Sequence, residues 1–241
     1  MILRGKGRPD GGYGRTPDGR RRIPGVTTIL GSWGDPNGLM RWYGKLGIDA
    51  AEAEAARTAH VGHAVHDAIE LELHGQDHSD PLLAIEDHAS RDQAWKAFEA
   101  WTRWRDELGG DLTFLATEVA MSDVATDTPF GGTVDAIARA ANGELLVIDW
   151  KTSKRLYPKH LTQCAAYADL WEARPEHDGE PIRGARIVRV DRETGDYEQC
   201  FPPDAVWEAA RVQWRVLLGA FYRERSIVQA TGLGQRRRGA A

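Results

Sequence analysis

The sequence predicts an α/β fold in which a small mixed sheet is flanked by helices. Two features indicate it. Stretches with helical hydrophobic periodicity lie on both sides of a block with strand-like patterns, and an Asn-Gly pair inside that block indicates a tight turn between two strands. The expected order is two helices, three strands, a helix, two strands and a helix, which describes helices packed on a mixed sheet.

The amino-terminal half is predicted to be helical. Residues 49–74 are rich in Ala, Glu and Leu. One stripe of this helix repeats at helical spacing and carries Ala59, Gly62, His63, His66, Glu70 and Leu73. Its small residues permit close backbone approach, while two imidazoles and a carboxylate share the same side. A second helix is expected over residues 87–108, where four aromatic residues are assigned to packing.

Extended structure is predicted after Gly109-Gly110. Three strands are expected over residues 112–121, 132–140 and 144–151, and Asn142-Gly143 joins the last two as an antiparallel hairpin. The elements expected after them are a helix over 161–173, a hairpin of 185–190 and 197–201, and a final helix over 204–223.

The length of 241 residues and the hydrophobic content of 41% favour one domain with elaborations. We expect a flexible basic arm over residues 1–22 and a single domain over 23–230. That domain divides into a helical part, 23–110, and a catalytic core, 111–230. A flexible basic tail is expected over residues 231–241.

The net charge of −5 argues against binding to nucleic acid through a general excess of basic residues, so any such contact must be local. Arg20, Arg21 and Arg22 in the arm are candidate DNA contacts, and a solvated flexible end is the alternative interpretation. Two cysteines far apart exclude a four-cysteine metal site and a dense disulfide framework. Without a membrane-spanning run or a secretory signal core, we expect a soluble, cytoplasmic protein.

The stretch 144–151 carries the most information about chemistry. Leu145, Val147, Asp149 and Lys151 point to one side of the expected strand, and the residues between them point to the other. Both sides are otherwise apolar, so this is a central strand. A carboxylate at Asp149 is therefore costly unless a cation or hydrogen bonds compensate for its charge.

Asp135 is expected to lie almost opposite Asp149 across the hairpin, because the two residues are nearly equidistant from the turn. Two converging carboxylates can hold Mg²⁺ or Mn²⁺, and the ammonium of Lys151 can position a nucleophile or offset developing charge. This combination suits phosphodiester hydrolysis. The alternative is that Asp149 and Lys151 merely end a strand and that Asp135 is a solvated hairpin residue.

Five short segments, in this order, resemble the RecB-like branch of the PD-(D/E)XK nuclease superfamily. The segments are Pro24-Gly25-Val26-Thr27-Thr28-Ile29-Leu30, Gly62-His63-Ala64-Val65-His66, Gly132-Thr133-Val134-Asp135, Asp149-Trp150-Lys151-Thr152-Ser153-Lys154 and Gln163-Cys164-Ala165-Ala166-Tyr167. Each is weak alone, and together they are specific. The resemblance implies a restriction-endonuclease-like core. No Pro directly precedes Asp135, and the four cysteines of iron–sulfur members are missing, which points to cluster-free exonucleases of phage type and of mitochondrial genome maintenance.

The resemblance also implies roles for individual residues. His66 is expected to bind the metal beside Asp135 and Asp149, and the backbone carbonyl of Trp150 is expected to complete the ligands. An imidazole ligand favours Mn²⁺ over Mg²⁺. Glu118 matches a glutamate of the family and is a further candidate for the site. Two more candidates follow from helical spacing alone: Glu70, which either orients the His66 imidazole or is a solvated helix residue, and His63, which either lies just outside the ligands or is a plain surface residue.

Gln163 and Tyr167 are four residues apart and share one helix face. The resemblance places both at the catalytic site, where Gln163 binds phosphate or orients Lys151 and Tyr167 stacks on a base. A buried tyrosine with a glutamine partner is the competing explanation. Thr152 and Lys154 are candidate DNA contacts.

These observations predict a Mg²⁺- or Mn²⁺-dependent DNA nuclease, an exonuclease that acts on DNA ends or single strands in replication, recombination or repair. A structure-specific endonuclease and a non-catalytic DNA-binding subunit are the alternatives. A zinc hydrolase built on His63, His66 and Glu70 would leave Asp149 and Lys151 unexplained. The expected partner is DNA and not a membrane, while a homo-oligomer or a recombination or replication protein as a further partner stays open.

Overall fold

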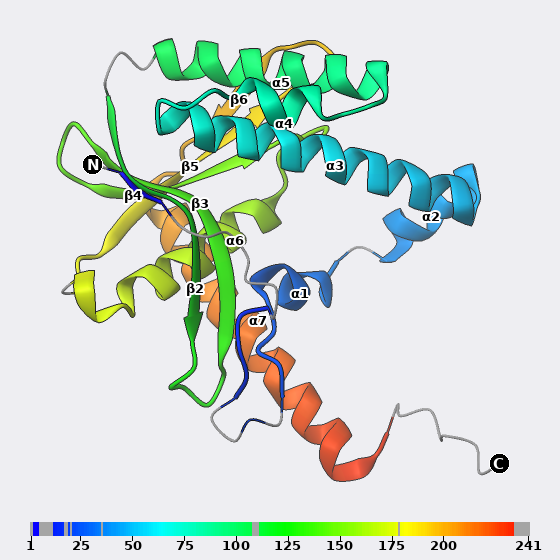
Figure 1. Ribbon diagram of the computed structural model, residues 1–241. Coiled ribbons are helices and arrows are strands. Elements are labelled where there is room, and N and C mark those ends of the chain that lie inside the picture. Colours follow the sequence, from blue (N-terminus) through cyan, green and yellow to red (C-terminus); the bar gives the residue numbers. More distant parts are fainter. Residues whose placement is uncertain are drawn as a thin grey trace.

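A six-stranded mixed sheet forms the centre of the computed structural model (Figure 1). The structure describes residues 2–4, 12–16, 19, 21–34, 36–107, 111–177 and 179–233. The strands follow one another across the sheet in chain order: β1 (Leu3–Arg4), β2 (Leu112–Asp123), β3 (Phe130–Ala140), β4 (Leu145–Lys151), β5 (Ile182–Val190) and β6 (Tyr197–Cys200). The pairs β1–β2 and β4–β5 are parallel and the others are antiparallel, so the predicted α/β class with a mixed central sheet is confirmed.

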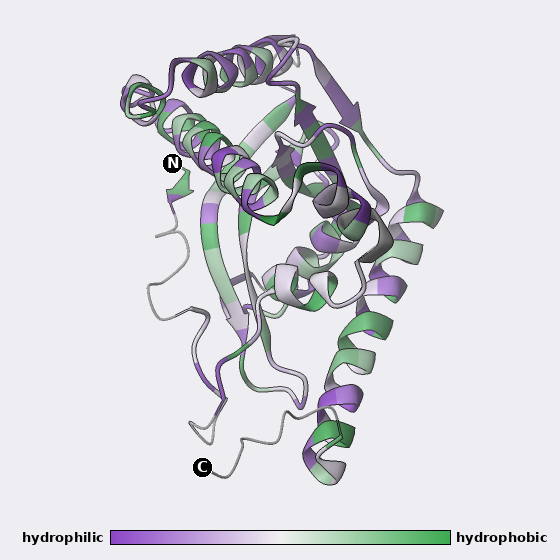
Figure 2. Ribbon diagram, turned by 90° about the vertical axis from the view of Figure 1, so that its right-hand side faces the viewer, coloured by the Kyte–Doolittle hydropathy of each residue, from purple (hydrophilic) through white to green (hydrophobic). Residues whose placement is uncertain are grey.

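Helices cover both faces of this sheet (Figures 1 and 2). One face is covered by α3 (Ile48–Leu73), α4 (Ser79–Leu83) and α5 (His88–Glu107). The other is covered by α1 (Val26–Gly31), α6 (Pro158–Glu172) and α7 (Asp204–Thr231). α2 (Pro36–Leu46) connects the two layers, and a 3₁₀ turn (Pro175–His177) follows α6. The buried apolar residues accordingly form two clusters, one on each face of the sheet.

The predicted catalytic hairpin is present, with Gly143 at a φ of +89° in its turn. The predicted alternation in β4 is confirmed as well. Leu145 and Val147 belong to the cluster beneath α6, whereas Leu146, Ile148 and Trp150 belong to the cluster beneath α5. There the Trp150 ring meets Trp101 and Trp104 edge-on, at centroid distances of 6.0 and 5.3 Å, so these aromatics pack as expected.

Several elements differ from the prediction. No helix was predicted over residues 26–31, yet α1 forms there with Val26 and Ile29 buried on one side of a short helix. α2 was not predicted, and it begins with a proline, which is favourable at a first helical position. The last helix continues beyond residue 223 to Thr231, since no helix breaker precedes Gly232, whose φ of +67° ends it.

Parts of the predicted flexible arm pair with the rest of the molecule. Leu3 and Arg4 form β1 alongside β2, and Arg15 and Arg22 form a β-bridge with each other. The predicted tail from residue 234 onward lies outside the described residues. Within the described part of the chain, none of the helices has the length and apolar content needed to cross a membrane.

A buried arginine joins α6 to α7. Arg211 lies 2.7 Å from Asp169 and 2.5 Å from Glu172, and its side chain is only 9% exposed. These two carboxylates raise the pKa of Arg211 further above its ordinary value despite its burial. Arg215, one turn later, also pairs with Asp169 at 3.0 Å, but it is 57% exposed. Because α6 carries Gln163 and Tyr167, the ion pairs of Arg211 also fix the position of one side of the predicted site.

We therefore expect Arg211→Met to lower the free energy of unfolding by about 2–3 kcal/mol, since it leaves two carboxylates without their buried partner. Arg215→Met serves as the matched control and should cost less than about 1 kcal/mol, because an exposed ion pair contributes little. Urea unfolding followed by circular dichroism measures both. Equal losses would show that burial of Arg211 is not what fastens the two helices.

Candidate functional site

Three side chains from three different elements converge at one point. His66 comes from α3, Glu118 from β2 and Asp135 from β3. His66 Nδ1 lies 3.6 Å from Asp135 Oδ1 and 3.7 Å from Glu118 Oε1. One potential ligand atom from each residue lies within 4.8 Å of the others, which is close enough for a single ion to bind all three.

Asp135 lies where β3 and β4 separate. The last ladder pair is Ala136 with Ile148, so Asp135 and Asp149 occupy the next position on the two strands, as the count from the turn predicts. The Asp135 carboxylate then accepts a hydrogen bond from the backbone N–H of Trp150, with Oδ2 at 2.8 Å. A side chain thus replaces the backbone partner that the diverging strand no longer provides.

Asp149 is completely buried beneath α6, and its Oδ2 lies 2.5 Å from the ammonium of Lys151. Apart from this ion pair, neither of its carboxylate oxygens has a hydrogen-bond partner among the described residues. A buried carboxylate with so few partners is costly unless a further cation is nearby.

The pKa values of these groups reflect their mutual proximity. Burial lowers the pKa of His66, but the carboxylates of Asp135 and Glu118 outweigh it and raise the value to about 9. Burial raises the pKa of Asp149 to about 6, with Lys151 opposing the shift and Asp135 adding to it. Burial also lowers the pKa of Lys151, yet the neighbouring aspartates raise it above its ordinary value. Lys151 is therefore charged at neutral pH.

Glu118 has an unusual backbone conformation. Its φ is +47°, the one positive φ at a non-glycine position in the described chain. A side chain in this region costs free energy, and such strain accumulates at functional sites. The residue lies in β2 between Thr117 and Val119, which pair with Ala136 and Val134 of β3, so Glu118 lies across from Asp135.

Gly62 explains how α3 approaches the site closely. A Cβ atom at Gly62 would lie 3.1 Å from Thr152 Oγ1, so a larger residue there would require the Thr152 side chain to shift by a few tenths of an ångström. Between them is a cleft of about 420 Å³ whose lining includes His63, His66, Glu118, Lys151 and Thr152.

Lys151 also lines a second hollow, of about 250 Å³, on the side of α1 and α6. Its polar lining includes Lys159, His160 and Gln163. Burial, followed by Lys151 and Lys159, lowers the pKa of His160 to about 3, and its Nδ1 accepts the backbone N–H of Tyr157 at 3.3 Å. The neutral ring therefore carries its proton on Nε2. His160 was not predicted as a site residue, although its position three residues before Gln163 on one helix places both on the same face.

Gln163 and Tyr167 contact each other, since Gln163 Nε2 donates to the Tyr167 hydroxyl at 2.7 Å. The Tyr167 ring is buried and lies so close to β3 that a Cβ atom at Gly132 would be 2.6 Å from Cε1. This glycine of the predicted motif is thus needed for packing. Tyr167 is therefore a buried tyrosine with a glutamine partner, and it also lies near the site, since burial and then the charges of Asp135 and Asp149 raise the pKa of its hydroxyl. Gln163 in turn lines the same hollow as Lys151.

Other predicted site residues lie around the cluster or away from it. His63 is exposed at the cleft, one turn from His66, and is not among the three converging groups. Glu70 accepts a hydrogen bond from Arg4 Nε at 3.0 Å, so it is engaged by β1. Lys154 is exposed just beyond the cleft. Arg21 and Arg22 line a hollow at the other end of the molecule, and Arg20 lies outside the described residues.

The residues at this site fit a divalent cation. Three carboxylates, those of Glu118, Asp135 and Asp149, face one ammonium and one imidazole, which leaves an excess of negative charge in a largely buried place. Oxygen ligands with one imidazole suit Mg²⁺ or Mn²⁺.

Comparison with known proteins agrees with this geometry. The family model of the PD-(D/E)XK nuclease superfamily matches residues 39–214. None of the curated proteins compared matches the sequence.

Two solved structures are similar in part. The crystal structure of SSO0001 is 17% identical, with 65% of this chain and 74% of that chain covered and a TM-score of 0.30. The structure of LHK-Exo in complex with dAMP is also 17% identical, with 73% and 93% covered and a TM-score of 0.30. Both likenesses are too distant to support an assignment, which depends on the family model.

That model extends from α2 into α7 and includes every element that contributes to the cluster. Together with the Asp135, Asp149 and Lys151 arrangement, it establishes that the chain belongs to the PD-(D/E)XK nuclease superfamily.

Proposed function

We propose that this protein is a metal-dependent deoxyribonuclease that hydrolyses phosphodiester bonds, and that it acts as an exonuclease on DNA ends or single strands. The observation that carries the proposal is the convergence of the partly buried His66, Glu118 and Asp135 beside the Asp149–Lys151 ion pair. Membership of a nuclease superfamily supports the reaction class.

In this proposal His66, Glu118 and Asp135 hold Mg²⁺ or Mn²⁺, with Asp149 and the Trp150 carbonyl beside them. The bound ion would polarise the scissile phosphate and lower the pKa of a water molecule. The proposal that Glu118 is a metal ligand has more support from its position than from the sequence alone, because its ligand atom lies within 4.8 Å of those of His66 and Asp135.

Lys151 serves as the fixed positive charge of the site. Its pairing with Asp149 at 2.5 Å holds the ammonium near the cleft, where it can offset charge on the phosphate during hydrolysis. Gln163 lies in the adjoining hollow with Lys151 and is suited to orient the ammonium or a phosphate oxygen. Thr152 and Lys154 lie at and beyond the edge of the cleft and are proposed as DNA contacts.

The choice of an exonuclease depends on the likeness of the five ordered sequence motifs to cluster-free RecB-like enzymes of phage type. Such an enzyme would act in replication, recombination or repair. A structure-specific endonuclease would use the same cluster, and a non-catalytic subunit would be expected to have lost part of it.

Lys151→Ala and Asp149→Ala should each reduce DNA cleavage by at least about a hundredfold, because each removes a preorganised charge from the site. The assay follows loss of end-labelled linear DNA with Mg²⁺, with Mn²⁺ or with a chelator, and only the two metals should support cleavage. Lys96→Ala is the control, since Lys96 is an exposed lysine on α5 paired with Asp92. Full activity in either site variant, or in chelator, would contradict the proposed chemistry.

Glu118→Gly should unfold at a higher urea concentration than Glu118→Ala, with a difference of roughly 1 kcal/mol, because glycine tolerates the φ of +47° and alanine does not. Both variants lack the carboxylate, so the comparison isolates backbone strain. Both should also lose Mn²⁺ affinity relative to the unaltered protein in calorimetric titration. Unchanged Mn²⁺ binding would remove Glu118 from the proposed ligands.

Linear and covalently closed circular DNA should behave differently if the enzyme needs an end. We expect the linear form to be degraded to nucleotides or short oligomers and the closed circle of the same sequence to survive, as judged by gel electrophoresis. Cutting of the circle at a comparable rate would instead identify an endonuclease with the same catalytic residues.

A further inference from the structure

A third hollow, separate from the two beside Lys151 and larger than both, lies at the opposite end of the sheet from α5. It has a volume of about 620 Å³ and is formed where the amino-terminal arm, the β2–β3 turn and the end of α7 meet (Figure 1). Three arginines line it: Arg21 and Arg22 from the arm and Arg225 from α7. Among the described residues of this lining, Asp127 is the one that is acidic.

These arginines differ from many others among the described residues. Arg57, Arg105, Arg139, Arg189 and Arg211 each pair with carboxylates. By contrast, Arg21, Arg22 and Arg225 have no ion pair with any described residue, although the protein as a whole is acidic. Three unpaired guanidinium groups around one hollow form a local positive surface that suits a polyanion.

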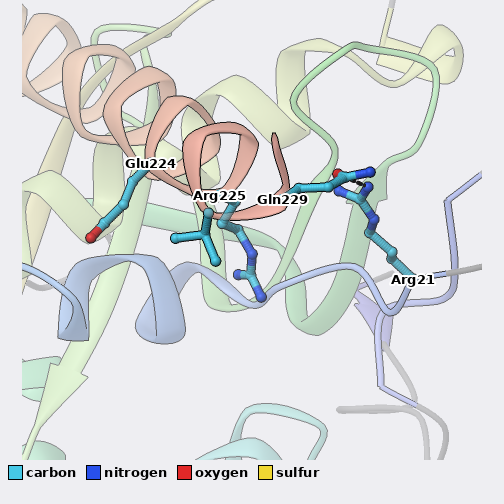
Figure 3. A pocket seen from close by; sticks show the side chains of 5 residues that line it. Arg21, Glu224, Arg225 and Gln229 are labelled. Carbon is cyan, nitrogen blue, oxygen red and sulfur yellow. Dashed lines mark hydrogen bonds between the residues drawn. The ribbon is translucent and has the colours of Figure 1, made fainter. Parts of the chain in front are cut away.

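The two arginines labelled in Figure 3 are held by contacts that leave some of their N–H donors free. The guanidinium of Arg21 donates to Gln229 of α7, and Arg225 lies over the Phe221 ring with its central carbon 4.5 Å from the ring centroid. Figure 3 shows an adjoining pocket that shares Arg21, Arg225 and Gln229 with this hollow. Arg21 reaches from the arm to Gln229 and Arg225 extends toward the arm, while Glu224, which also lines the pocket shown, points in another direction. Each guanidinium carries five N–H donors, so donors remain on both for phosphate oxygens.

The backbone of the arm fixes the hollow in place. Arg15 and Arg22 form a β-bridge, and Thr16 N–H donates to the Arg21 carbonyl at 2.9 Å. On the other side, the Tyr222 hydroxyl donates to the Pro129 carbonyl and joins α7 to the β2–β3 turn. The arginines therefore extend from a built surface and not from a free chain end.

The hollow and the catalytic cluster lie at a distance that DNA can bridge. Pro129 lines the hollow and directly precedes β3, and Asp135 lies six residues later within β3. At roughly 3.3 Å per strand residue this is about 20 Å. One strand of B-form DNA rises about 3.4 Å per nucleotide, so the separation corresponds to about six nucleotides.

We propose that this arginine hollow binds the sugar–phosphate backbone of the DNA substrate about six nucleotides from the bond that is cut. The inference rests on the proposed nuclease function and adds where the uncut part of the substrate lies. It also gives α7 a role in substrate binding through Arg225, which lies far from the sequence motifs.

The test measures binding of fluorescein-labelled oligonucleotides by anisotropy with Mn²⁺ present, in an Asp149→Ala background in which cleavage is slow. In this background, the double variant Arg21→Gln/Arg225→Gln should bind a 20-nucleotide strand roughly tenfold more weakly than the protein with both arginines and should show a smaller dependence of affinity on salt. A trinucleotide, which is too short to reach the hollow from the cluster, should bind equally to both proteins.

Arg215→Gln is the matched control, because Arg215 is an exposed arginine on the same helix that pairs with Asp169 outside the hollow. It should leave binding of the 20-nucleotide strand unchanged. Equal binding of that strand by the double variant would overturn the inference, and so would an equal loss for the trinucleotide. If the length-dependent loss is found while the unaltered protein cleaves no DNA with Mg²⁺ or Mn²⁺, the binding role stands and the proposed catalysis fails.

Discussion

The structure depends on placing carboxylates where two central strands separate. The backbone ladder between β3 and β4 ends at Ala136 and Ile148, and the Asp135 carboxylate then satisfies the N–H of Trp150. A buried donor without a partner would cost as much as a lost hydrogen bond, so this side chain supports the strand geometry as well as the site. Asp149 keeps its ladder pairing with Ile187 of β5, and its side chain meets that of Lys151 because residues two apart lie on the same side of a strand.

Both helical layers then contribute to the same point. α3 reaches it from one face of the sheet because Gly62 allows contact with Thr152, and this places His66 beside Asp135. α6 reaches it from the other face and is fastened to α7 through Arg211. A site assembled from opposite layers is sensitive to the spacing of the whole fold. This explains why its small residues, Gly62 and Gly132, lie at the closest approaches.

The sequence predicted what depends on local periodicity. The alternation in β4 predicted that Asp149 is buried, and the Asn142-Gly143 turn predicted its position relative to Asp135. Both predictions follow from strand geometry alone. Glu118 could be only a candidate, since its positive φ arises from tertiary contacts and has no counterpart in side-chain pattern. α1 was not predicted, because the burial of Val26 and Ile29 outweighs the weak local preference of its residues for helix. α7 was predicted to end too early, because no helix breaker follows residue 223 until Gly232.

The distribution of charge connects the two ends of the molecule. The cluster of Glu118, Asp135 and Asp149 would by itself repel a phosphate, so a cation and Lys151 must balance it before a polyanion can approach. The protein also has a net charge of −5, which gives long-range repulsion and no general affinity for DNA. Attraction must then come from arginines that are not already neutralised by carboxylates. Pro129, which lines the hollow with Arg21, Arg22 and Arg225, lies six strand residues, or about 20 Å, from Asp135. Charges about that far apart are largely screened at physiological salt, so in the proposed binding mode these arginines hold the DNA with little effect on the electrostatics of the proposed metal ligands.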